Sequence, residues 1–169
     1  PPPPPPPPPP PASPEPRELV AGFSVGVGVM GCTEDSCEGS AGFAAGGHLG
    51  GFVARRLALV ASVSVIVANQ EVPGYARVKN TRSVIGVGVR FWATPRLWLE
   101  AGMGRASVSS ASNGGSGESE HVASLFGGFG YEVRRTTAVV LDVRFRGGVE
   151  SYGDVEYAAN SFELGFSWF

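Results

Sequence analysis

Seven charged side chains interrupt segments that otherwise hold glycine, serine and apolar residues, and they are the first candidates for chemistry. They are Arg90, Glu100, Glu132, Asp142, Arg144, Arg146 and Glu163. Each occupies the same alternating positions as the small residues of its segment. An unpaired buried charge is costly, so we expect carboxylates and guanidinium groups on one face to pair. Both signs are present, which predicts a salt-bridged network and not an ion-selecting ring of one charge.

Counting outward from the predicted turns gives partners for some of these charges. If 94–96 is a hairpin loop, the residues on either side of it must face each other in order. The same count applies across the first tight turn and across the last connection. The predicted facing pairs are Arg90 with Glu100, Trp92 with Trp98, His48 with Ser62 and Arg146 with Glu163. Arg134 is assigned to this charged face, whereas Arg82 is assigned to a loop.

Enzymatic chemistry finds little support in the sequence. Nucleophilic catalysis needs a nucleophile, a base and an orienting acid close together. The two histidines are His48 and His121, and His121 lies near Ser124. On an alternating strand these two residues point to opposite faces. We therefore predict no catalytic residues, no cofactor and no metal site.

Two cysteines flank a short polar segment, CTEDSC. Cys32 and Cys37 are close enough in sequence to close a small disulfide loop in an oxidising compartment. Two free thiols are the alternative. We predict the disulfide.

The charged residues lie on eight alternating segments, with no helical period between them. The segments are 18–32, 41–53, 57–70, 82–93, 97–109, 122–134, 138–149 and 160–169. Three connections are short (54–56, 94–96, 135–137) and four are long and polar (33–40, 71–81, 110–121, 150–159). A tilted strand of about 9–11 residues crosses a bilayer. The pattern predicts an up-and-down antiparallel arrangement with all long loops at one end.

The two faces of these segments differ sharply, as in ELVAGFSVGVGVMGC at 18–32. Over the central part of each segment one face is apolar and uncharged, and the other is mainly glycine and serine with the charges. A soluble barrel would bury the bulky face and show water a surface of bare glycine, which weakens strands. A membrane barrel turns the bulky face to lipid and fills its narrow lumen with small and charged residues. We therefore predict an all-β, eight-stranded antiparallel transmembrane β-barrel.

Composition sets further limits on this chain of 169 residues. A net charge of −2 argues against nucleic-acid binding through phosphate neutralisation. The sequence opens with eleven prolines, which favour an extended polyproline II rod. We divide the chain into a proline-rich spacer at 1–17 and a barrel at 18–169.

The closing stretch SFELGFSWF, with the strand count and alternating loop lengths, resembles the small bacterial outer-membrane β-barrels of the OmpX and OmpA transmembrane-domain type. That family ends in an alternating strand with a terminal aromatic, which the barrel assembly machinery reads. The corresponding residues here are Phe162, Leu164, Phe166, Trp168 and Phe169. Trp168 is in phase with the other aromatics and Phe169 is one residue beyond.

The resemblance implies a bacterial outer-membrane location, extracellular long loops and a periplasmic N-terminus. It also implies contact with outer-membrane lipid and lipopolysaccharide, help from periplasmic chaperones, a monomeric state, and Cys32 and Cys37 in the first outer loop. We expect a non-enzymatic barrel with a role in membrane structure or surface interaction. The alternatives are a narrow channel, a lipid-modifying barrel enzyme and a soluble lipocalin-like barrel.

Overall fold

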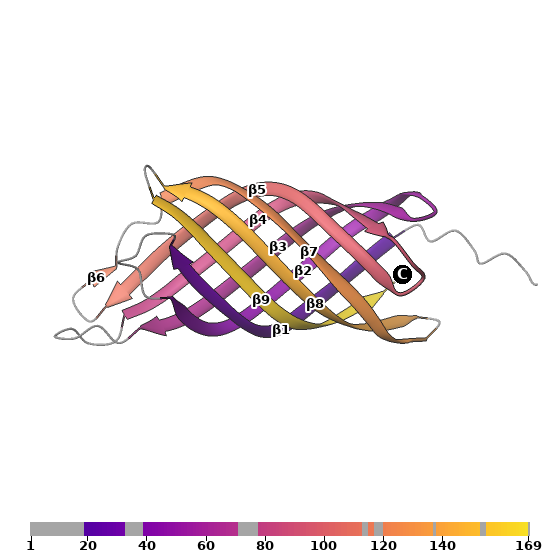
Figure 1. Cartoon of the computed structure of the whole chain (residues 1–169), viewed down its shortest axis with the longest axis horizontal. Helices are drawn as coiled ribbons and strands as arrows, with labels where there is room; N and C mark the ends of the chain where they lie inside the picture. Colours follow the sequence, from indigo (N-terminus) through magenta and orange to yellow (C-terminus); the bar gives the residue numbers. More distant parts are fainter. Residues whose placement is uncertain are drawn as a thin grey trace, which may run out of the picture.

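The chain forms a closed antiparallel β-barrel with strongly tilted strands (Figure 1). The computed structural model describes residues 19–32, 39–70, 78–112, 115–116, 120–136, 138–152 and 155–168. The strands are β1 (Leu19–Cys32), β2 (Ser40–Ala54), β3 (Leu57–Gln70), β4 (Val78–Trp92), β5 (Leu97–Ser112), β6 (Gly115–Ser116), β7 (Glu120–Arg135), β8 (Val139–Tyr152) and β9 (Val155–Trp168).

Closure follows from the pairing order β4-β3-β2-β1-β9-β8-β7-β5, because β4 also pairs with β5. The short β6 is an addition that pairs only with the end of β5. The predicted eight-stranded up-and-down barrel is therefore confirmed. A closed barrel leaves no unpaired sheet edge, which is the condition for crossing lipid with strands. Within the described ranges, no helix is long and apolar enough to cross a membrane.

At the long-loop end the strands run further than predicted. β4 begins at Val78 and not at 82, and β9 begins at Val155 and not at 160. Only residues 153–154 separate β8 from β9, so the predicted long loop at 150–159 is wrong. The apolar alternation marks only the part of a strand that faces the apolar surroundings. Backbone pairing continues beyond that part, where polar residues such as Lys79, Asn80 and Asn160 interrupt the apolar alternation.

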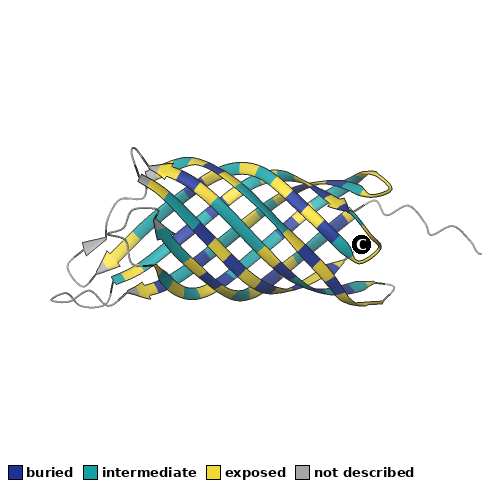
Figure 2. Cartoon of the chain, in the orientation of Figure 1, coloured by how far each residue is buried: buried dark blue, intermediate teal, exposed yellow. Residues whose placement is uncertain are grey.

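Buried and exposed residues alternate along every strand of the barrel (Figure 2). The exposed members are the bulky ones, including Val27 at 65% exposure and Ile85 at 68%. They belong to the face that the sequence assigned to lipid, so the inside-out arrangement is confirmed. Soluble monomers rarely expose a continuous apolar surface of this extent. The outward residues instead match the apolar belt of membrane barrels.

The glycines of the inward face make room for large inward rings. A Cβ added to Gly86 would lie 2.7 Å from Cε1 of Phe126, and Gly102 is packed against the same ring. Gly130 is packed in the same way against the indole of Trp98. Since an eight-stranded barrel is only wide enough for side chains, each large residue inside requires small ones opposite.

The outward belt predicts a position-dependent cost for a new charge. We expect Val87→Arg, in the middle of the belt on β4, to lower the free energy of unfolding in lipid vesicles by about 2–4 kcal/mol. Thr81→Arg, on the same face of the same strand beyond the belt, should cost about 0–1 kcal/mol. Urea titration in vesicles measures both values. Equal costs for the two variants would contradict the assignment of the belt to lipid.

The packing of inward glycines predicts a second contrast. Gly86→Ala should destabilise the barrel by about 1–3 kcal/mol, because the new methyl group overpacks the lumen against Phe126. Gly47→Ala is the matched control, since its Cβ would lie 3.6 Å from the nearest atom, Cγ1 of Val63. It should change stability by no more than about 0.5 kcal/mol. The same vesicle titration compares them, and a silent Gly86→Ala would show that the lumen has spare room.

Candidate functional site

The lumen contains all seven charged residues that the sequence singled out. Arg90, Glu100, Glu132, Asp142, Arg144 and Glu163 are buried in it, and the side chain of Arg146 is 12% exposed. Strand alternation explains this placement, because each residue lies in phase with the inward glycines and serines of its strand. The lumen is therefore the candidate functional site.

The central ion pair joins β4 to β5. Arg90 Nε donates to Glu100 Oε2 at 2.8 Å, and the two residues face each other in the register as predicted. Arg90 Nη1 also donates to His48 Nε2 at 3.1 Å. The guanidinium carbon lies 4.3 Å from the centre of the Trp98 ring, a cation–π contact. The predicted Trp92–Trp98 and His48–Ser62 pairs are also in register.

The predicted pairing of Arg146 with Glu163 is wrong by two residues. Arg144 faces Glu163, and Arg146 faces Ser161, because the β8–β9 turn lies at 153–154. Arg144 instead forms a bidentate pair with Asp142 on its own strand, with both N–O distances 2.7 Å. Glu163 accepts a hydrogen bond from Ser161 Oγ at 2.6 Å.

A further buried ion pair escaped the sequence analysis. Arg82 and Glu150, both assigned to loops, form an ion pair inside the barrel, with Arg82 Nε 3.0 Å from Glu150 Oε2. Ser124 Oγ donates to the same carboxylate at 2.7 Å. Continuing the strand alternation into the predicted loops would have identified both residues as inward-facing. Arg82 is in step with Arg90, and Glu150 is in step with Arg144.

Arg134 does not belong to the lumen, which corrects its assignment. The β7–β8 register shifts between Glu132 and Arg134, so Arg134 follows a bulge and is exposed. Such a bulge places two residues opposite one and reverses the alternation beyond it. Arg135 forms the ion pair with Glu132, with Nε 2.7 Å from Oε2. Trp92 Nε1 donates to the other oxygen of that carboxylate at 3.0 Å.

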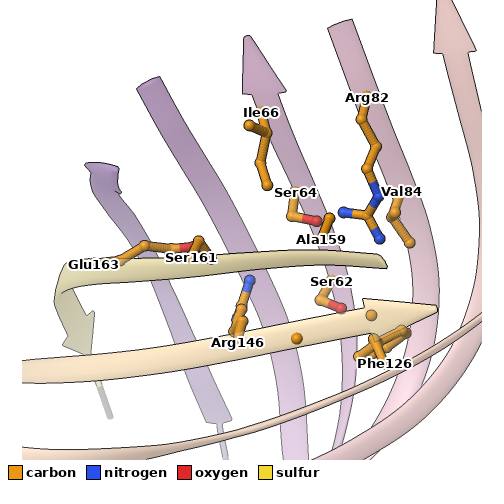
Figure 3. Close-up of a pocket in the computed structure, with 12 residues that line it drawn as sticks. Ser62, Ser64, Ile66, Arg82, Val84, Phe126, Arg146, Ala159, Ser161 and Glu163 are labelled. Carbon is orange, nitrogen blue, oxygen red and sulfur yellow. The ribbon is translucent and has the colours of Figure 1, made fainter. Parts of the chain in front are cut away.

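A small cavity lies inside the barrel, and Figure 3 shows side chains that line it. Arg82 and Arg146 reach it from different strands, and Ser161 and Glu163 also line it. Its volume is about 30 Å³, which is room for one or two water molecules. Arg146 Nε and Nη2 and Glu163 Oε2 are buried without a hydrogen bond to the described residues. The cavity therefore offers these atoms a place for solvation and is too small for a metabolite.

Apolar clusters lie in the lumen on both sides of the charges. At the short-turn end, Trp92 and Trp98 pack with Val20, Ala58, Val60 and the partly buried Phe52. Toward the long loops, Ala44, Ile66 and Ala159 pack with Met30. The Arg90–Glu100 pair thus lies between two apolar clusters, and this arrangement obstructs a continuous water path.

The described side chains do not assemble a nucleophilic site. His121 is exposed and Ser124 is buried, so they diverge as the alternation predicts. His48 Nε2 lies 3.5 Å from Ser167 Oγ but already accepts a hydrogen bond from Arg90. No group of three or more His, Cys, Asp or Glu side chains among these residues is placed to hold a metal ion.

The remaining predicted sites belong to the first and last strands, β1 and β9, and to the residues next to them. Phe162, Leu164, Phe166 and Trp168 alternate outward on β9, and the Phe23 ring stacks on that of Phe166 with centroids 5.2 Å apart. Phe169 lies outside the described residues. Cys32 is the last residue of β1 and Cys37 is outside the described ranges, so their disulfide stays a prediction.

Solved structures share this architecture. No family model and no curated protein matches the chain. Neisserial surface protein A matches with a TM-score of 0.63 at 14% identity, over 89% of this chain and 96% of that one. Ail, the attachment invasion locus protein of Yersinia pestis, matches with a TM-score of 0.59 at 16% identity, over 89% of this chain and 99% of that one. The chain has the fold of the small outer-membrane β-barrels. That shared fold accounts for an inside-out barrel with a filled lumen.

The contribution of the Arg90–Glu100 pair to the stability of the barrel can be measured. We expect Arg90→Met to lower the free energy of unfolding by about 3–5 kcal/mol, because it leaves the buried Glu100 carboxylate with only the more distant Arg146, whose Nη2 lies 3.9 Å from Oε1. The double variant Arg90→Met/Glu100→Leu should recover part of that loss, with a coupling of about 0.5–3 kcal/mol.

Urea titration in vesicles gives the free energies of unfolding of the single and double variants, which together form a double-mutant cycle. Arg96→Met is the control, since Arg96 is an exposed arginine in the turn that joins β4 to β5. It should change stability by no more than about 0.5 kcal/mol. Additive single-variant costs would show that the pair is not coupled.

Proposed function

We propose that the chain is a non-enzymatic barrel of the bacterial outer membrane that works in membrane structure or surface interaction, with its long-loop end outside the cell. The single observation that carries this proposal is the division of the barrel into an apolar outer belt and a lumen filled with paired charges. The belt requires lipid around it. The filled lumen leaves the loop end as the part that can meet a partner.

The loop end has features suited to contact outside the membrane. β4 and β5 extend past the belt, and their outward residues there are polar, with Ser83 Oγ 2.9 Å from Ser107 Oγ. Lys79 is exposed on the same extension. Paired strands hold these residues more rigidly than loops would. The extension is therefore a scaffold on which a binding surface can be built.

One structural neighbour offers a direction for the partner. The Yersinia pestis protein has a structure in complex with the heparin analogue sucrose octasulfate. In this chain the long connections at 33–39 and 117–119 carry Glu34, Asp35, Glu38 and Glu118, and the connection at 71–77 carries one residue of each charge, Glu71 and Arg77. That acidity opposes binding of a sulfated polyanion, so the surface of this chain better suits a partner of neutral or basic character.

The proposed location and monomeric state are tested on the purified chain. A monomeric membrane barrel must require detergent and must migrate differently in gels before and after boiling. An epitope placed in segment 113–119 should be accessible on intact cells, whereas one before Pro1 should need permeabilisation. A monomer that stays soluble without detergent would favour the lipocalin-like alternative.

The closed lumen makes a prediction about conductance. In planar bilayers the wild-type barrel should give no sustained nanosiemens steps, because ion pairs and the Trp92–Trp98 layer fill the lumen. True aqueous pores have about 16–18 strands. A general porin serves as the positive control in the same bilayers. Sustained steps from the wild-type chain would instead support the narrow-channel alternative.

A further inference from the structure

All exposed side-chain charge at the short-turn end of the described barrel is positive. Arg55 and Arg56 form the β2–β3 turn, Arg96 ends the β4–β5 turn, and Arg134 and Arg135 end β7. All five are exposed. Every short turn of the barrel thus contributes at least one arginine, and together they surround this rim.

No exposed carboxylate among the described residues balances this charge. The carboxylate nearest the rim, Glu132, is buried and paired with Arg135. Arg55, Arg56, Arg96 and Arg134 therefore form a set of cations with no acidic partner among those residues, here called the arginine rim. The acidic residues of the long connections all belong to the opposite end of the barrel.

The arginine rim lies directly beside the apolar belt. Val53 precedes Arg55 on the outward face of β2, and Val133 immediately precedes Arg134; both valines are exposed. At the edge of a bilayer, an arginine can lay its methylene stem on apolar surface while its charged head reaches the polar layer. The arginine rim is therefore level with lipid headgroups.

Arginine, and not lysine, occupies every one of these positions. A guanidinium binds phosphate through two parallel hydrogen bonds, which makes it suited to phosphate recognition. Basic residues beside an anionic membrane surface are also attracted by its negative potential. Phosphate at the level of the belt edge is supplied by phospholipid.

We propose that the arginine rim binds the phosphate groups of anionic phospholipids in the leaflet at the short-turn end. The proposal rests on the membrane location proposed above, and it holds for either orientation of the barrel. It assigns this rim a lipid preference that the apolar belt alone does not provide.

The experiment uses the full chain in nanodiscs made from phosphatidylcholine with a minor share of phosphatidylglycerol. Mass spectrometry of lipids that stay bound after extraction gives the enrichment of phosphatidylglycerol. The wild-type chain should enrich it, and Arg55→Gln/Arg56→Gln/Arg96→Gln/Arg134→Gln should lower the enrichment by about five-fold or more, from the attraction of each cation to an anionic surface. The corresponding Arg→Lys variant should give an intermediate enrichment, because it keeps the positive charges and loses the two parallel hydrogen bonds to phosphate. Arg135 is left unchanged because it pairs with Glu132.

A matched pair of variants distinguishes an effect of where a charge lies from an effect of the net charge of the protein. Arg96→Gln and Lys79→Gln each remove one exposed positive charge, at opposite ends of the barrel. The first should lower the enrichment and the second should have the smaller effect. Equal losses, or no loss in the four-arginine variant, overturn the proposal. Heat-modifiable gel mobility verifies that each variant is folded.

Two further outcomes are informative. If the wild-type chain inserts into nanodiscs without preferring phosphatidylglycerol, the lipid proposal fails while the membrane location stands. If it does not insert at all, the location itself fails. A cell-wall polymer is the competing anionic partner. Co-sedimentation with isolated cell-wall sacculi that the four-arginine variant loses, with lipid enrichment unchanged, would also overturn the proposal.

Discussion

The narrowness of an eight-stranded lumen is the constraint on which the rest of this structure depends. A barrel of this size encloses space for side chains and little else. Trp92, Trp98, Phe126 and several guanidinium groups can share that space only because glycines lie opposite them. The glycines of the inward face are therefore a packing requirement, and most of the bulky apolar residues lie on the outside as a consequence.

The same narrowness controls the electrostatics. Charges held in a lumen this small are shielded from bulk water, and each must find a partner within reach. The structure meets this condition with Arg90–Glu100, Arg144–Asp142 and Arg82–Glu150. Arg90–Glu100 joins the neighbouring strands β4 and β5, Arg82–Glu150 joins β4 to β8, and Arg144–Asp142 lies on β8 alone. A filled lumen moves any interaction with partners to the rims and loops.

The two rims differ in chemistry. The short-turn rim is rich in exposed arginine next to the apolar belt, whereas the other end combines extended polar strands with acidic connections. Because the two ends of the barrel differ in charge, each end suits a membrane surface of a different electrostatic potential. The two ends of the barrel thus differ in charge, although the strands of its wall are nearly regular.

Strand alternation alone determined the closed barrel, the outward belt and the Arg90–Glu100 pair, because a short turn fixes the register of the two strands next to it. The tertiary structure decided the rest. Arg144 rather than Arg146 faces Glu163 because backbone pairing carried β8 and β9 past the apolar pattern to a turn at 153–154. The same extension brought Arg82 and Glu150 inside, and a bulge turned Arg134 out. Hydrogen bonding between strands sets where they end and bulge, and this depends on neighbours that the local pattern does not contain.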